Sequence, residues 1–267
     1  MKLANIWNGL LINIQFFTII PIRKEIQMTK SNLTGMILTL PLFGMFLGII
    51  SAFTLAGLIH FTPLSNLAIS IVFIVFMTVI TGGIHIDGWM DTFDGFFSYQ
   101  EKQKRLVIME DPRIGAFGVL GLLLIIVLKF LFIFETISTA QPYLLIYIVA
   151  IPFLSRMFTG IGLILINPAK TTGLGYLFHS TNYKVLRYYL IYIIPTIIIL
   201  GIYNLNYMLV FAFLVGLIGM FFIVFKRFAI RGFGGLTGDL SGAGIEGVEL
   251  ILWFLMWLLH YYVMVGL

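Results

Sequence analysis

Three aspartates stand close together in a chain that has only 11 acidic residues among 267. The segment T-G-G-I-H-I-D-G-W-M-D-T-F-D-G, residues 81–95, places Asp87, Asp91 and Asp94 at positions i, i+4 and i+7. On a helix these positions share one face, where three ionised carboxylates repel one another unless a cation compensates them. Hard oxygen ligands favour Mg²⁺, Mn²⁺ or Ca²⁺ over zinc, and Mg²⁺ is usually completed by substrate phosphates. The spacing therefore predicts a magnesium site, whereas an acidic helix start that complements the helix dipole would explain Asp87 only.

The neighbours of the aspartates suit a phosphate substrate. His85 precedes them, and we expect it to donate to a phosphate oxygen or to move a proton. Gly88 and Gly95 are expected to keep the adjacent surface open for a bulky ligand. In the segment R-L-V-I-M-E-D-P-R-I-G-A-F-G, residues 105–118, two arginines suit bidentate phosphate binding. They are Arg105 and Arg113, and ordinary basic flanking of a membrane span is the alternative for both.

Further polar residues are expected near the same site. Asp111 is a candidate metal ligand or general base. The glycine-rich stretch at residues 226–246 predicts a loop that lets backbone N–H groups approach an anion, with Thr237, Gly238 and Asp239 as substrate contacts. A flexible linker is the alternative, because the stretch matches no standard phosphate-binding fingerprint.

Two basic residues fall inside apolar segments. Arg156 lies deep in one of them, where an ionisable side chain marks a functional site by default. Its expected partners are the aspartate cluster or an anionic substrate. Lys129 lies nearer a segment end and can extend its ammonium toward water.

The elements that position these residues must be membrane helices. The chain is 60% hydrophobic and 10% charged with a mean hydropathy of +1.07, against about 45–50% and about 25% in soluble domains. Cysteine is absent, which excludes disulfides and thiolate metal sites. The pI near 9.4 suits anionic lipids or substrates. Nucleic acid is not an expected partner, because the basic residues lie between spans.

Seven segments are long and apolar enough to cross a bilayer, which takes about 20 residues. They are residues 33–59, 65–84, 116–134, 143–166, 188–204, 206–225 and 249–266. Residues 3–18 predict an amphipathic helix lying in the membrane interface, with a first span as the alternative. Its apolar face would carry Leu3 and Trp7, and its polar face Asn8 and Asn13.

Basic residues predict the orientation. With the N-terminus in the cytoplasm, the cytoplasmic segments are 1–32, 85–115, 167–187 and 226–248. These hold 14 of the 16 Lys and Arg residues, as the positive-inside rule requires. We therefore predict one all-α, polytopic membrane domain over residues 1–267, a helical bundle of about seven transmembrane helices plus the interfacial helix. Its active site would face the cytoplasm at the cell membrane, and a homo-oligomer stays open.

The motifs resemble those of the cobalamin synthase family, adenosylcobinamide-GDP ribazoletransferase. The resemblance rests on F-F-T-I-I-P-I at 16–22, the two segments at 81–95 and 105–118, Ser155-Arg156, and G-G-L-T-G-D-L-S-G-A-G-I-E at 234–246. These blocks follow in family order over nearly the whole chain. The departures, Trp89-Met90 for the common Leu-Ala and Pro112 for Ser, touch no proposed ligand.

The resemblance implies an Mg²⁺-dependent integral membrane enzyme that closes the nucleotide loop of coenzyme B12. The 5′ oxygen of α-ribazole, or of its 5′-phosphate, would attack the cobinamide-side phosphorus of adenosylcobinamide-GDP, and GMP would leave. By matching position, Asp87, Asp91 and Asp94 become the Mg²⁺ ligands. Two rivals remain: another membrane phosphotransferase acting on a nucleotide-linked alcohol, and an ion-coupled transporter, which would place its carboxylates near mid-membrane.

Overall fold

The computed structural model describes residues 2–139, 144–179, 183–259 and 261. Within these residues the chain forms helices and no strand. They are α1 (Leu3–Phe17), α2 (Lys30–Phe61), α3 (Asn66–Ile80), α4 (Ile84–Phe97), α5 (Lys102–Ile108), α6 (Ala116–Thr139), α7 (Leu144–Leu165), α8 (Gly173–Phe178), α9 (Lys184–Tyr203), α10 (Leu205–Phe233) and α11 (Gly238–Leu259). Six of them, α2, α6, α7, α9, α10 and α11, are long and apolar enough to cross a membrane. The predicted polytopic helical membrane protein is confirmed.

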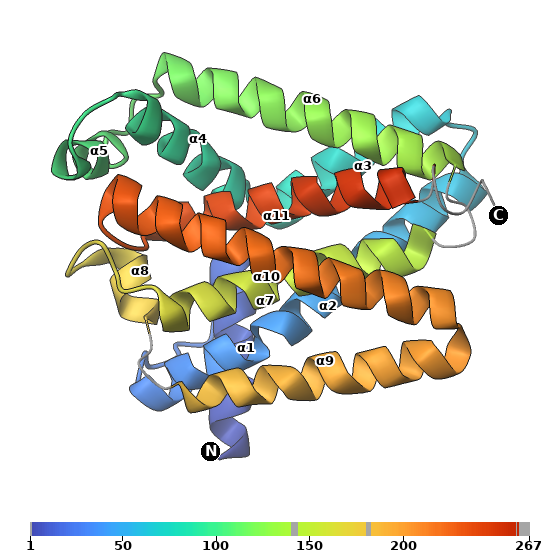
Figure 1. The fold of residues 1–267 in the computed structure, drawn as a ribbon, viewed down its shortest axis with the longest axis horizontal. Helices are drawn as coiled ribbons and strands as arrows, with labels where there is room; N and C mark the ends of the chain where they lie inside the picture. Colours follow the sequence, from blue (N-terminus) through green and yellow to red (C-terminus); the bar gives the residue numbers. More distant parts are fainter. Residues whose placement is uncertain (1, 140–143, 180–182, 260, 262–267) are drawn as a thin grey trace.

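The long helices run between two ends of the bundle. Figure 1 shows the short helices α5 and α8 at one end and the turn between α9 and α10 at the other. Helix α7 lies in the middle and packs against both α2 and α11. The polar segments that the sequence singled out therefore gather at the α5–α8 end.

The predicted span at residues 65–84 corresponds to α3 and the sharp bend that follows it, and α3 and α4 pass together as one broken span. Helix α3 stops at Ile80, and α4 leaves at an angle of 89° to it. The turn needs left-handed backbone, which Gly82 (φ +65°) and Gly83 (φ +71°) adopt without the steric cost of a side chain. The aspartates therefore sit on a separate helix that is laid across the end of α3.

The predicted glycine-rich loop at residues 226–246 is wrong in its extent, because nearly all of this stretch is helical. Helix α10 continues to Phe233 and ends at Gly234, which has a left-handed φ of +86°. Helix α11 begins at Gly238, where the Thr237 hydroxyl accepts from Leu240 N at 3.1 Å. A Cβ on Gly242 would lie 3.2 Å from His85 Cα. The glycines within α11 thus allow close helix packing, and the loop itself is residues 234–237. Residues 260 and 262–266 of the last predicted span lie outside the described residues.

Helix α1 forms as predicted, but Asn13 of its predicted polar face is packed against α2 and does not face water. Asn13 is fully buried and donates to Met36 O at 2.9 Å and to Thr39 Oγ1 at 3.0 Å. Trp7 is 58% exposed. With 15 residues the helix is about 22 Å long, short of the ~30 Å hydrocarbon core. Its length agrees with the interfacial location, which stays a prediction.

Candidate active site

The three aspartates lie on one α-helix, as their spacing predicted. Asp87 is exposed, while Asp91 and Asp94 are half-buried in α4. Asp91 is within electrostatic range of Asp87, Asp94 and also Asp239 from α11. Among the described residues neither Asp87 nor Asp91 forms an ion pair with a basic side chain. Within the described residues, no ion pair therefore compensates the negative charge of Asp87 and Asp91.

The glycines of α4 serve helix packing. A Cβ on Gly88 would lie 2.7 Å from Asp239 O, and one on Gly95 would lie 2.8 Å from Met109 Cγ. The expectation that these glycines leave an open surface for a ligand is wrong. Because Gly88 lets α11 approach the backbone of α4, it brings Asp239 beside the aspartate face.

Asp94 is bound by the start of the following span. Its Oδ2 accepts from Gly115 N and its Oδ1 from Gly118 N, both at 2.8 Å. The first turn of a helix leaves such N–H groups unpaired, and its dipole favours an anion there. Asp94 thus satisfies the N-terminus of α6, which leaves its oxygens less available to a metal than those of Asp87 and Asp91.

A second polar segment reaches the site through a short backbone pairing. Ala169 N donates to Leu236 O and Leu236 N donates to Asn167 O, both at 2.9 Å. This pairing sets Lys170 next to the loop at 234–237 and within electrostatic range of Asp239. Lys170 Nζ donates to Glu110 Oε1 at 2.6 Å and to Leu106 O at 3.2 Å. Lys170 thus brings a cation to the edge of the site, beside Asp239.

Arg105 is committed to structural contacts. Its Nε donates to Gln100 O at 2.7 Å and its Nη1 to Gly232 O at 3.3 Å. The guanidinium also lies 5.1 Å from the centroid of the Phe96 ring. Its predicted role in substrate binding stays a prediction, but the contacts hold the α4–α5 turn against the end of α10.

Arg113 and Asp111 pair with each other at the surface. Arg113 Nε and Nη2 donate to the two Asp111 oxygens at 2.9 and 2.6 Å, and the Arg113 side chain is 87% exposed. The hydrogen bonds from Arg113 lower the pKa of Asp111 to about 2. A general base works best with a pKa near the working pH, so in this arrangement Asp111 is a poor base.

His85 lies on the side of α4 away from the aspartates. At about 100° per residue it is roughly 160° from Asp87 around the helix. Its ring is buried, 5.9 Å from the ring of Phe17 on α1, and lines an interior cavity. The structure does not bring His85 together with the predicted metal ligands.

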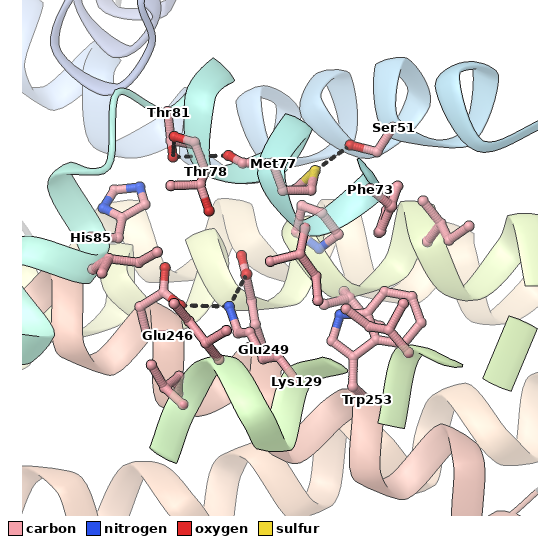
Figure 2. A pocket seen from close by; sticks show the side chains of 18 of the residues that line it. Ser51, Phe73, Met77, Thr78, Thr81, His85, Lys129, Glu246, Glu249 and Trp253 are labelled. Atoms are coloured by element: carbon pink, nitrogen blue, oxygen red, sulfur yellow. Dashed lines mark hydrogen bonds and ion pairs between the residues drawn. The ribbon is translucent and has the colours of Figure 1, made fainter. Parts of the chain in front are cut away.

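Arg156 does not reach the aspartates either. It is buried in α7 and pairs with Glu249 of α11, a residue that the sequence analysis did not single out. Lys129 of α6 donates to Glu246 at 2.5 Å and to Glu249 at 3.1 Å instead of extending to the membrane surface (Figure 2). These four side chains, named here the buried ion network, balance two positive and two negative charges inside the bundle. The expected partnership of Arg156 with the aspartates is wrong.

The face formed by Asp87, Asp91 and Asp239 can take part in binding a divalent ion. Among the described residues, no three His, Cys, Asp or Glu side chains lie close enough to hold a metal by themselves. Mg²⁺ does not need such a set, since it is usually bound by one or two carboxylates with water and substrate phosphates. The uncompensated oxygen donors of Asp87 and Asp91 fit that requirement, and the three-aspartate site stays a prediction.

Comparison with known proteins finds one matching family and several relatives that share the same name. The cobalamin-5-phosphate synthase family matches residues 9–257. A protein of Geobacillus sp. called adenosylcobinamide-GDP ribazoletransferase is 38% identical over 99% of this chain and 100% of its own length. Relatives with the same name from Geobacillus thermodenitrificans and Treponema denticola are each 34% identical, over 97% and 91% of this chain and 98% and 94% of their own. No solved structure matches.

Proposed function

We propose, from the premise that this chain belongs to the cobalamin-5-phosphate synthase family and is a transferase, that it joins α-ribazole or its 5′-phosphate to adenosylcobinamide-GDP. The acceptor's 5′ oxygen forms a bond to the cobinamide-side phosphorus. The bond from that phosphorus to the bridging oxygen breaks, and GMP leaves with the electron pair. The observation that carries the proposal is the uncompensated carboxylate face of α4, set opposite Asp239 at the polar end of the bundle.

The residues at this end have separable roles. Asp87 and Asp91 would hold Mg²⁺, which would supply positive charge that stabilises the phosphate of the departing GMP. Asp239, on a different helix, would orient the attacking hydroxyl and accept its proton. Lys170 and Arg113 would bind the GDP phosphates, Lys170 by exchanging Glu110 for phosphate oxygens and Arg113 by leaving Asp111.

The location of the site supports the use of soluble nucleotide substrates. The proposed ligands lie at the end of the bundle that carries α5 and α8 (Figure 1). The Lys and Arg bias assigns this end to the cytoplasm. We therefore propose that the enzyme resides in the cell membrane and takes adenosylcobinamide-GDP from the cytoplasmic side.

The test is GMP release by the purified protein in lipid nanodiscs with adenosylcobinamide-GDP, α-ribazole and Mg²⁺. We expect GMP and a cobalamin product in equal amounts, both abolished by EDTA and restored by added Mg²⁺. The matched control is Asp91→Asn, and omission of α-ribazole controls for plain hydrolysis. GMP release that needs a lipid alcohol in place of α-ribazole would support the rival phosphotransferase. Uptake of substrate into sealed vesicles with no product would support the transporter.

A further inference from the structure

A small cavity lies inside the bundle, beneath the start of α4. It measures about 50 Å³ and is lined by both apolar side chains and the buried ion network. Figure 2 shows Lys129 between Glu246 and Glu249, with His85 and Thr81 to one side. Since one water needs about 10–15 Å³ of such space, the cavity holds roughly three waters and no larger ligand.

Two buried polar atoms on residues that line this cavity have no partner. They are His85 Nε2 and Arg156 Nε. His85 is 4% exposed and Arg156 1%. Leaving a buried polar group without a hydrogen bond costs roughly 1–3 kcal/mol, so such groups are nearly always satisfied by protein or by ordered water.

The ion network makes the cavity a polar environment that favours water. His85 lies within electrostatic range of Arg156, Glu249 and Lys129, so a water beside it has charged neighbours. A bound water typically makes about three hydrogen bonds, and this cavity offers both donors and acceptors. Apolar cavities, by contrast, stay dry.

We propose that this cavity is a water-binding site in which bound waters join His85 to Arg156 and Glu249. Through these waters His85 is a positioning residue that fixes the first turn of α4, and hence the direction of Asp87 and Asp91. The geometry alone supports the water site, whereas the effect of His85 on catalysis also depends on the proposed function. His85 then needs a hydrogen-bonding side chain but no titrating one.

The water site can be tested directly by X-ray hydroxyl-radical footprinting of the wild-type protein. Radicals formed from bound water label the side chains next to it. Phe73 and Phe43 are matched probes, because both are buried, at 2% and 0% exposure, and only Phe73 lines the cavity. We expect labelling of Phe73 at least fivefold above that of Phe43. Equal, background labelling of both would overturn the proposal.

Two substitutions test the positioning role. We expect His85→Gln, which keeps a hydrogen-bonding group without a titrating one, to retain kcat within about fivefold. We expect His85→Leu to lower kcat at least tenfold with KM nearly unchanged, because His85 is buried on the side of α4 away from the aspartates. Equal large losses in both variants would assign proton transfer to His85, and a Leu variant as active as the Gln variant would assign plain packing; either result overturns the positioning role.

Failure of this inference and failure of the proposed function are distinguishable. If wild-type protein releases no GMP, the proposed function fails, while the footprinting still decides the water site. Should His85→Leu not reach the membrane in folded form, the His85→Gln variant and the footprinting contrast carry the test.

Discussion

Replacing Gly118 by Ala should uncouple α6 from the aspartate helix. A Cβ at this position would overlap Asp94 Oδ2 and lie 3.1 Å from Asp94 Cγ. The overlap is not tolerated, so the carboxylate has to move. Because Asp94 accepts from Gly115 N and Gly118 N through its two oxygens, the movement breaks both hydrogen bonds.

The size of the effect follows from those two bonds. A hydrogen bond to a charged group contributes roughly 1.5–3 kcal/mol. Asp94 is half-buried, so water replaces part of the hydrogen bonding that the carboxylate loses. With the lower value for each bond, the two bonds together contribute about 3 kcal/mol. If the active geometry requires this contact, about 3 kcal/mol lowers kcat on the order of 100-fold.

The assay is the rate of GMP release in nanodiscs at saturating substrate, with the thermal unfolding midpoint measured in parallel. The matched control is Gly216→Ala, since Gly216 is an exposed helical glycine at which an added Cβ would have no neighbouring atom within 4 Å. Helix propensity alone favours Ala over Gly by about 1 kcal/mol. Gly216→Ala should therefore leave the unfolding midpoint unchanged or raise it slightly, whereas Gly118→Ala should lower it.

Wild-type kcat and an unchanged midpoint in Gly118→Ala would refute this account of Asp94. A second measurement separates anchoring from metal binding. With Asp94 as an anchor, Asp94→Asn keeps Mn²⁺ affinity, measured by electron paramagnetic resonance, within about threefold of wild type. If Asp94→Asn lost as much Mn²⁺ binding as Asp91→Asn, Asp94 would be a metal ligand.

Three further results are expected. Asp91→Asn should lower kcat/KM by at least about 1000-fold, since metal binding stabilises charge in the transition state, while the protein still inserts into the membrane, as checked by GMP release and membrane fractionation. Arg156→Met should destabilise the fold by roughly 3–5 kcal/mol, because Glu249 is left buried with fewer partners, and thermal unfolding should show this against a neutral Lys104→Met control. The depressed pKa of Asp111, about 2, means that this carboxylate stays ionised from neutral pH down to its folded pKa. Asp111→Asn should accordingly leave the shape of the pH–rate profile between pH 5 and 8 unchanged, and a lost acidic limb would contradict this.

The sequence was sufficient for features that depend on local spacing. The i, i+4, i+7 pattern placed Asp87, Asp91 and Asp94 on one helical face, and the structure confirms that face. The apolar segments located the spans because a bilayer fixes the length of each helix. Both inferences use only neighbours along the chain.

Features that depend on which helices touch were missed. Glu249 is 93 residues from Arg156 and 120 from Lys129, so no periodicity connects them. A usable signal was nevertheless present. Two basic and two acidic residues inside apolar segments predict mutual pairing, because each would be costly alone in the membrane. The role of the glycines was mispredicted for a similar reason. Gly88 and Gly242 lie where α4 and α11 pack against each other, and the sequence does not show that these two helices are in contact.

Two groups of acidic residues in this protein lie in different surroundings. Glu246 and Glu249 lie inside the bundle and are matched by Lys129 and Arg156, because an uncompensated charge there would carry a large desolvation penalty. The carboxylate face of α4 lies at the polar end of the bundle, where water can solvate it, and its charge is left unmatched by the protein. Without a bound cation, the carboxylates of Asp87 and Asp91 would repel each other without pairing to any basic side chain of the described residues. Asp87→Asn and Asp91→Asn should therefore each keep or raise the unfolding midpoint measured without divalent ions while abolishing the stabilisation by Mg²⁺. A midpoint lowered in the absence of metal would mean that these carboxylates serve the fold instead.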